Sequence, residues 1–181
     1  MALTSANVRV AVTGEVLTGA TSATAPTGTG GTTTGFTGLG YVGEDGVTEK
    51  RERSTDDIKA WQNAATVRTL ITDSSLAYTF ALLETTKATV ELAYGTTVTQ
   101  TGVEGNYVIA PSTTGGRKSF IIDIVDGANL KRIYIPQGEI TEVGDVVCAS
   151  GEAIGYEVTV QTYPDTVISG NAKVWETALH S

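Results

Sequence analysis

The chain has 181 residues, 12 Lys and Arg against 20 Asp and Glu, and a formal net charge of −8. A single cysteine, Cys148, excludes an internal disulfide framework and a multi-cysteine zinc site, and a single histidine, His180, argues against histidine-based metal or acid–base centres. The acidic balance argues against nucleic-acid binding through an ordinary basic surface. The length predicts one domain, 1–181, large enough to fold without a covalent crosslink.

The negative charge is concentrated near the end of the chain. Seven acids and one base, Lys173, lie between Glu139 and Ser181. This segment is either a solvated acidic face or a uniformly negative surface that keeps an anionic molecule from binding. The apolar runs are too short to cross a bilayer, and the N-terminus lacks the regions of a secretory signal, so we expect no membrane association.

The first sixty residues predict strands separated by an uncharged loop. Val8, Val10 and Val12 alternate with more polar residues, which is typical of a half-buried strand. Thr, Gly, Ser and Ala dominate 20–38, which predicts a flexible loop, either an ordinary one or an assembly contact. A short strand is expected over 39–42, followed by a turn at 44–46.

The stretch from Glu44 to Lys59 carries many charges of both signs. It is either a solvated hairpin arm or a surface for ion pairs with a neighbouring copy. Within it, residues 54–57 are capable of capping a short helical turn that carries Ile58 and Trp61.

The middle of the chain predicts two strands and one helix. We expect strands over 66–72 and 76–82, with a turn at 73–75 between them. A helix is expected over 86–94, capped by Thr85 or Thr86 and ended by Gly95, with its apolar face on a sheet.

The second half again predicts strands, which we place at 107–110, 119–125, 130–135, 143–148 and 154–161. In the last of these, Ile154, Tyr156, Val158 and Val160 form one apolar face. Many short strands with one helix predict a mainly β fold: an antiparallel sandwich or barrel with one short flanking α-helix, extended loops and terminal arms. The arms are the N-terminal segment 1–38 and the tail 166–181, which carries Trp175.

The residues give little support for catalysis or cofactor binding. A Ser or Cys triad would require His180, which is poorly placed next to the chain end. Cys148 lies in an apolar run and is expected to be a buried, inert thiol. Residues 115–119 lack the phosphate-loop pattern, and 123–129 lack the calcium-loop spacing. We therefore expect no enzyme, cofactor or metal, although a carboxylate-dependent hydrolase on a β scaffold stays open.

Several segments resemble, in order, those of a known family of phage proteins. They are Gly40–Glu49, Arg53–Trp61, Val67–Thr69, Tyr78–Thr85 with the helix to Gly95, Gly155–Thr159 and Tyr163–Asp165. Together they are similar to the major tail proteins, or tail tube subunits, of long non-contractile tailed bacteriophages, as found on actinobacterial hosts. The likeness covers most of 40–165.

This resemblance implies a β-sandwich with a flanking helix and a structural protein of the virion, made in the host cytoplasm. It implies hexameric rings that stack into a tube through which DNA passes transiently at ejection, and no enzymatic activity. The implied partners are further copies of the chain, together with the tape measure, tail terminator and baseplate or distal tail proteins. The alternative is a non-enzymatic phage decoration or receptor-binding β module.

A stacked tube needs one contact that closes a ring and a second that repeats along the axis. Our choice for the axial contact is a charged arm at the following residues: Glu44, Asp45, Glu49, Lys50, Arg51, Glu52 and Arg53. The polar face of the last predicted strand is the candidate lumen wall, because DNA should meet negative charge there and slide. The residues assigned to it are Glu157, Thr159 and Gln161, with Glu152 as a weaker choice.

Overall fold

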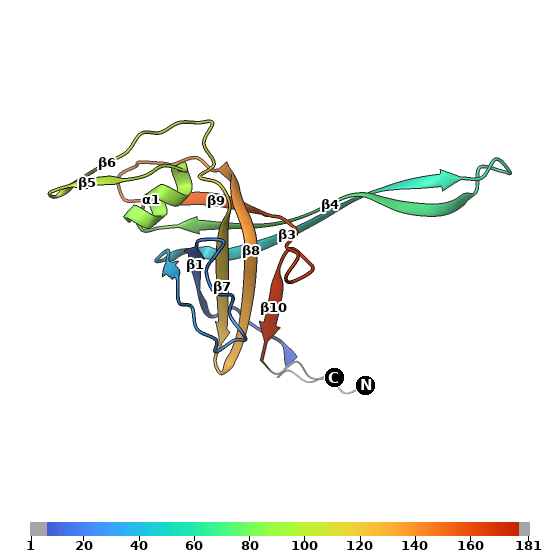
Figure 1. The fold of residues 1–181 in the computed structure, drawn as a ribbon, viewed down its shortest axis with the longest axis horizontal. Helices are drawn as coiled ribbons and strands as arrows, with labels where there is room; N and C mark the ends of the chain where they lie inside the picture. Colours follow the sequence, from blue (N-terminus) through green and yellow to red (C-terminus); the bar gives the residue numbers. More distant parts are fainter. Residues whose placement is uncertain (1–6, 178–181) are drawn as a thin grey trace.

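The computed structural model describes residues 7–177, and its elements follow one another in a mainly antiparallel arrangement (Figure 1). His180, the first six residues of the predicted N-terminal arm and the last four of the C-terminal tail lie outside the described residues. The elements are β1 (Thr13–Gly19), β2 (Phe36–Gly38), β3 (Val42–Lys59), β4 (Thr66–Leu82), α1 (Lys87–Tyr94), β5 (Thr99–Thr101), β6 (Glu104–Asn106), β7 (Lys118–Asp126), β8 (Asn129–Val143), β9 (Tyr156–Thr162) and β10 (Lys173–Glu176).

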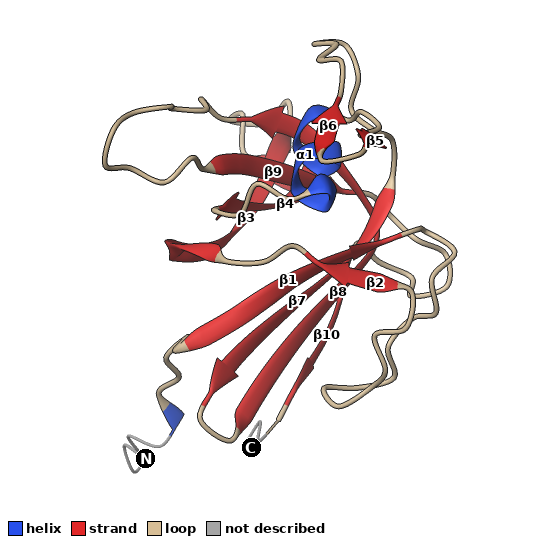
Figure 2. Cartoon of the chain, turned by 90° about the vertical axis from the view of Figure 1, so that its left-hand side faces the viewer, coloured by secondary structure: helices blue, strands red, loops and turns tan. Residues whose placement is uncertain are grey.

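The strands form an eight-stranded sheet in the order β2-β1-β7-β8-β9-β4-β3, with β10 paired to β8, and β5 and β6 form a separate small hairpin. Strand β8 joins the two halves of the large sheet, because Asn129–Ile135 pairs with β7 and Gly138–Val143 pairs with β9. Figure 2 shows the two halves facing each other, with α1 beside the upper one. The predicted mainly β, antiparallel sandwich with one short helix is confirmed.

The core lies between these two halves and follows from strict alternation along the strands. Phe120 and Ile122 of β7 face Phe80 of β4 and Val158 of β9, and all four side chains are almost fully buried. At the bend of β8, a Cβ on Gly138 would lie 2.8 Å from both Phe120 and Val160. A glycine is therefore required for the two layers to approach.

Helix α1 covers one end of this core as the sequence predicts. Thr86 is its N-cap and accepts a hydrogen bond from the Thr89 backbone N–H at 3.2 Å, and Gly95 ends the helix with φ 59°. Val90 and Ala93 are buried, and Tyr94 meets Tyr156 edge-on with ring centroids 6.1 Å apart.

Strands β3 and β4 form a long hairpin that leaves the body (Figure 1), and we call this hairpin the arm. The predicted turn at 73–75 is wrong, because β4 runs without a break from Thr66 to Leu82 and these residues pair with 52–54. The predicted helical turn carrying Ile58 and Trp61, capped by 54–57, is wrong for a similar reason: 54–59 are extended and pair with β4. Pairing along the ribbon satisfies backbone groups that the local sequence would otherwise bond within a turn. The actual turn is at 60–65, where Asn63 and Ala64 have positive φ.

The turn expected at 44–46 is an irregularity within β3 instead. The register of β3 on β4 shifts between Val42 and Val47, and Gly46 has φ 66°. The strand expected over 39–42 begins only at Val42, although Leu39 is fully buried and its N–H donates to the Val16 carbonyl at 2.9 Å.

Three other predicted strands differ in position. The N-terminal strand begins at Thr13, so Val8, Val10 and Val12 precede it and are exposed. Residues 107–110 are not a strand, and β8 ends at Val143, which leaves 144–148 in a loop. Cys148 is consequently exposed, and its predicted burial is wrong.

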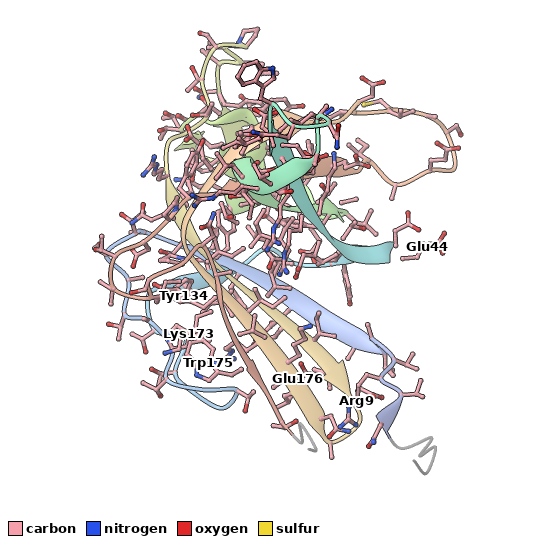
Figure 3. All side chains as sticks on the ribbon, turned by 90° about the vertical axis from the view of Figure 1, so that its right-hand side faces the viewer. Arg9, Glu44, Tyr134, Lys173, Trp175 and Glu176 are labelled. Atoms are coloured by element: carbon pink, nitrogen blue, oxygen red, sulfur yellow. The ribbon has the colours of Figure 1, made fainter. Side chains whose placement is uncertain are left out.

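The uncharged segment 20–38 is a loop up to β2, and one buried ion pair holds it to the sheet. Arg132 donates from Nε to Asp123 at 2.7 Å, and its Nη1 donates to the carbonyls of Gly28 and Gly31 at 3.3 and 2.8 Å. The loop thereby covers the outer face of β1, β7 and β8, where Tyr134 and Trp175 also pack (Figure 3).

Removing one partner of this ion pair should destabilise the free subunit strongly. Arg132→Met leaves the Asp123 carboxylate and two loop carbonyls without their donor, so we expect a loss of about 3–5 kcal/mol. Denaturant unfolding at neutral pH measures it. The double variant Arg132→Met/Asp123→Leu should recover much of the loss, and the exposed Arg53→Met serves as control; equal stability of Arg132→Met and wild type would contradict the assignment.

Candidate assembly surfaces

The seven residues predicted for an axial contact all lie on β3, at the base of the long hairpin. Glu44 and Asp45 are in the irregular first part of the strand, and Glu44 lies at the edge of the body (Figure 3). Glu49 to Arg53 follow on the part that leaves the body, and all five are exposed. The hairpin therefore brings the predicted residues together along one strand, in the solvated arm that the charge pattern indicates.

Ion pairs within the arm join residues two positions apart, on alternate faces of β3. Lys50 meets Glu52 at 2.9 Å on one face, and Arg51 meets Glu49 at 3.5 Å on the other. The hydrogen bond from Lys50 to Glu52 is the main cause of the raised pKa of Lys50. These exposed pairs add little stability, because solvent screens them.

Glu49 connects the arm to the core through Tyr78. The Tyr78 hydroxyl donates to the Glu49 carboxylate at 3.1 Å, and the two residues are directly opposed on β3 and β4. Burial, followed by the neighbouring Glu49 charge, raises the pKa of Tyr78 well above its ordinary value. Tyr78 therefore stays protonated, and its hydrogen bond holds the Glu49 side chain on the face of β3 that is directed toward the core.

The far end of the arm carries residues that the sequence analysis assigned to a helical turn. Trp61 is 99% exposed, and Ile58 and Val67 are also exposed. Lys59 and Arg68 lie beside them, and 58–68 contains no acid. Their position at a tip was missed, although the small and polar residues 62–65 are a turn signal.

The candidate lumen residues on β9 share one face of the sheet. Tyr156, Val158 and Val160 point into the core, which leaves Glu157, Thr159 and Gln161 on the opposite face. Ile154, predicted to lie with the apolar set, precedes β9 and is 39% exposed. Cross-strand pairing gives this face a Thr79–Thr159 hydroxyl contact of 3.0 Å.

Strand β8 adds two further acids to the same face. Glu139 is opposite Gln161 and Glu142 is opposite Thr159, while Ile140 between them points into the core. Three carboxylates, those of Glu139, Glu142 and Glu157, thus lie on the polar face of β8 and β9, which we call the acidic face. Alternation around Ile140 indicates the face of Glu139, but Glu142 joins that face only through the register shift between Ile140 and Glu142, and sequence spacing reveals neither the shift nor the pairing of β8 with β9. Glu152 lies in the 144–155 loop, outside the strands that form this face.

Within residues 7–177, no group of three or more His, Cys, Asp or Glu could hold a metal ion. Over the same residues, no helix is long and apolar enough to cross a membrane.

The comparison with protein families gives one match along almost the entire chain. The family model described as phage tail tube protein matches residues 1–175. The chain belongs to the phage tail tube protein family. No match was found among curated proteins. Membership in the tail tube family makes the chain a structural protein of the phage tail that assembles with itself into a tube, and it confirms the resemblance noted in the sequence.

The Tyr78–Glu49 contact predicts a pH-dependent stability at the base of the arm. A tyrosine whose folded pKa is raised contributes stability that is present below its unfolded pKa of about 10 and is lost as the pH rises further. Tyr78→Phe should cost about 1 kcal/mol at neutral pH, and its deficit relative to wild type should shrink in alkali. Denaturant unfolding at several pH values measures this.

The variant still contains Tyr94 and Tyr134, whose pKa values burial also raises, so part of the alkaline loss remains in both proteins. Tyr41→Phe, which alters an exposed ring, is the matched control. A constant deficit of Tyr78→Phe from neutral to alkaline pH would contradict the interpretation.

Proposed function

We propose that this tail tube protein forms hexameric rings that stack into the hollow tube of a long non-contractile tail, and that DNA passes through the tube into the host at ejection. The observation that supports this best is the acidic face. Glu139, Glu142 and Glu157 lie on a strand surface whose other side is the core, so a ring can present them inward without loss of packing.

An inward acidic face suits a channel for DNA. Phosphates that meet fixed cations bind and release counterions, whereas a net negative wall gives them no site to bind. Lys50 lies near this face, but its ammonium group is engaged by Glu52 at 2.9 Å. Thr159 and Gln161 add neutral polar surface between the acids. DNA thus passes without being held.

Ring closure can use a strand edge. Strand β3 is at the end of the sheet, and over the described residues it pairs only with β4. Its second edge therefore carries backbone N–H and C=O groups that another subunit can pair with. The same contact, repeated by rotation, closes a ring.

Stacking of rings then uses the arm. Its base carries the mixed charges from Glu44 to Arg53, which suit ion pairs with a neighbouring ring, and the hairpin projects away from the body (Figure 1). The terminal arms, 1–38 and 166–181, are further candidates for contacts between subunits. In the virion, the tube ends meet the tape measure, tail terminator and baseplate or distal tail proteins. The proposed role is structural: the chain forms the wall of the tube and carries out no enzymatic step.

Electron microscopy of the purified chain tests the proposal directly. We expect sixfold rings or hollow tubes, and hydrogen exchange should show 20–59 gaining protection on assembly, because neighbours then cover it. Stable, monodisperse trimers would contradict the proposal and favour a decoration or receptor-binding module.

Charge reversal tests the lumen assignment. Glu157→Lys with Glu142→Lys should leave tube assembly intact but slow DNA ejection from phage that carry the variant, because phosphates then meet cations along the wall. Glu104→Lys, on the separate β5–β6 hairpin, is the control and should eject normally. A map of the tube with Glu157 on the outer surface would exclude the assignment.

A further inference from the structure

A cleft of about 800 Å³ lies at the base of the arm, between β1 and the first part of β3. One wall is β1, where Thr13 to Glu15 pair with β7 on one side only, since β2 pairs with residues 17–19. The opposite wall is the segment 38–47, which includes the irregular start of β3. The cleft therefore contains an unpaired strand edge, and exposed Val12 and Tyr41 give it apolar surface.

The charge of the cleft is negative. Its lining includes Glu15, Glu44, Asp45 and Glu84, and none of the described residues that line it is Lys or Arg. Asp123 also lines it but is neutralised by Arg132. Glu84 is fixed in place because its carboxylate accepts the Tyr41 N–H at 3.0 Å, and this position requires glycine at 40, where a Cβ would overlap the carboxylate.

The tip of the arm has the complementary properties. Trp61 projects into solvent with 99% of its surface exposed, Ile58 and Val67 flank it, and Lys59 and Arg68 are the charged residues of 58–68. Trp and Arg are among the residue types that most often dominate the binding energy of protein contacts. An apolar, cationic projection and a partly apolar, anionic cleft thus occur on one chain.

We propose that the arm tip of one subunit, residues 58–68, docks into the base cleft of a second copy, with Trp61 as the anchor and Lys59 and Arg68 facing Glu44 and Asp45. This inference rests on the proposed tube and names the surface that receives the arm. A subunit's tip does not reach its own cleft, because about eleven residues of paired strand, roughly 36 Å, separate Glu49 from the turn.

Because tip and cleft are different surfaces, this contact is head-to-tail. A heterologous contact that does not close on itself propagates into an open chain, which is the property that axial growth of a tube requires. The cleft also lies where the arm of its own subunit begins. Each docked tip therefore contacts the base of the next projecting arm, so successive subunits connect through one continuous ribbon.

Charge exchange provides the first test. Lys59→Glu/Arg68→Glu should raise the protein concentration needed for tube growth by roughly tenfold or more, and Trp61→Ala should do likewise. Glu44→Lys/Asp45→Lys should be equally impaired, whereas tube growth should recover when the two doubly reversed sets are combined in one chain. Lys131→Glu, on β8, is the charge control. Normal growth of Lys59→Glu/Arg68→Glu and Trp61→Ala would overturn the inference and leave the tube proposal standing.

Crosslinking separates the two proposals further. In a Cys148→Ser background, Gln62→Cys at the tip and Ala11→Cys at the cleft, treated with a short bifunctional thiol reagent, should give a ladder of oligomers. Each single cysteine should give no ladder. A ladder without tubes supports the docking and overturns the tube; tubes without a ladder, or dimers alone, overturn the docking; neither tubes nor a ladder overturns both.

Discussion

The continuity of β4 from the core into the arm is the constraint on which the rest of the molecule depends. Residues 77–82 pair with β9 on one side and β3 on the other, and they supply Tyr78, Phe80 and Leu82 to the core. Residues 66–74 pair with β3 alone and are exposed. A two-stranded ribbon is marginal by itself in water. The arm is therefore stabilised from its base, and its direction is fixed by the packing of the body.

The pleat of the sheet lets the same strands serve the core and a second surface. Along β8 and β9, residues that face the core alternate with Glu139, Glu142 and Glu157. On β3 the same alternation directs Glu49 to buried Tyr78 and Lys50 to the side of the acidic face. A shift of register by one residue would exchange these environments. The core thus fixes which charges lie on the opposite side of these strands, and burial of the apolar face maintains the acidic one.

The sequence predicted the fold class and the elements that contact the core, since α1, β7 and β9 have clear caps or alternation. It failed where both faces of a strand meet solvent. Residues 73–75 are turn formers by local preference, yet pairing with 52–54 keeps them extended. Cys148 was placed in a strand because its neighbours are apolar, but β8 ends at Val143. The candidate residues on β9 could be assigned to a face from alternation, whereas Glu139 and Glu142 joined them only through the pairing of β8, which sequence spacing does not reveal.

The distribution of charge along the arm also opposes non-specific pairing of its exposed strand edge. An exposed strand edge as long as that of β3 invites pairing with any extended chain. The alternating charges from Glu49 to Arg53 oppose this, because a partner strand must match them in register. The exposed large apolar side chains of the arm lie in its outer part, at Ile58, Trp61 and Val67 of the tip and at Leu70 and Ile71 next to it on β4. Lys59 and Arg68 lie among them. Pairing out of register along the charged part of β3 is thus disfavoured, while the outer part of the arm keeps an exposed apolar surface. The selectivity of contacts between subunits thus depends on the charged segment without large apolar side chains, Glu49–Arg53, as much as on the apolar residues near the tip.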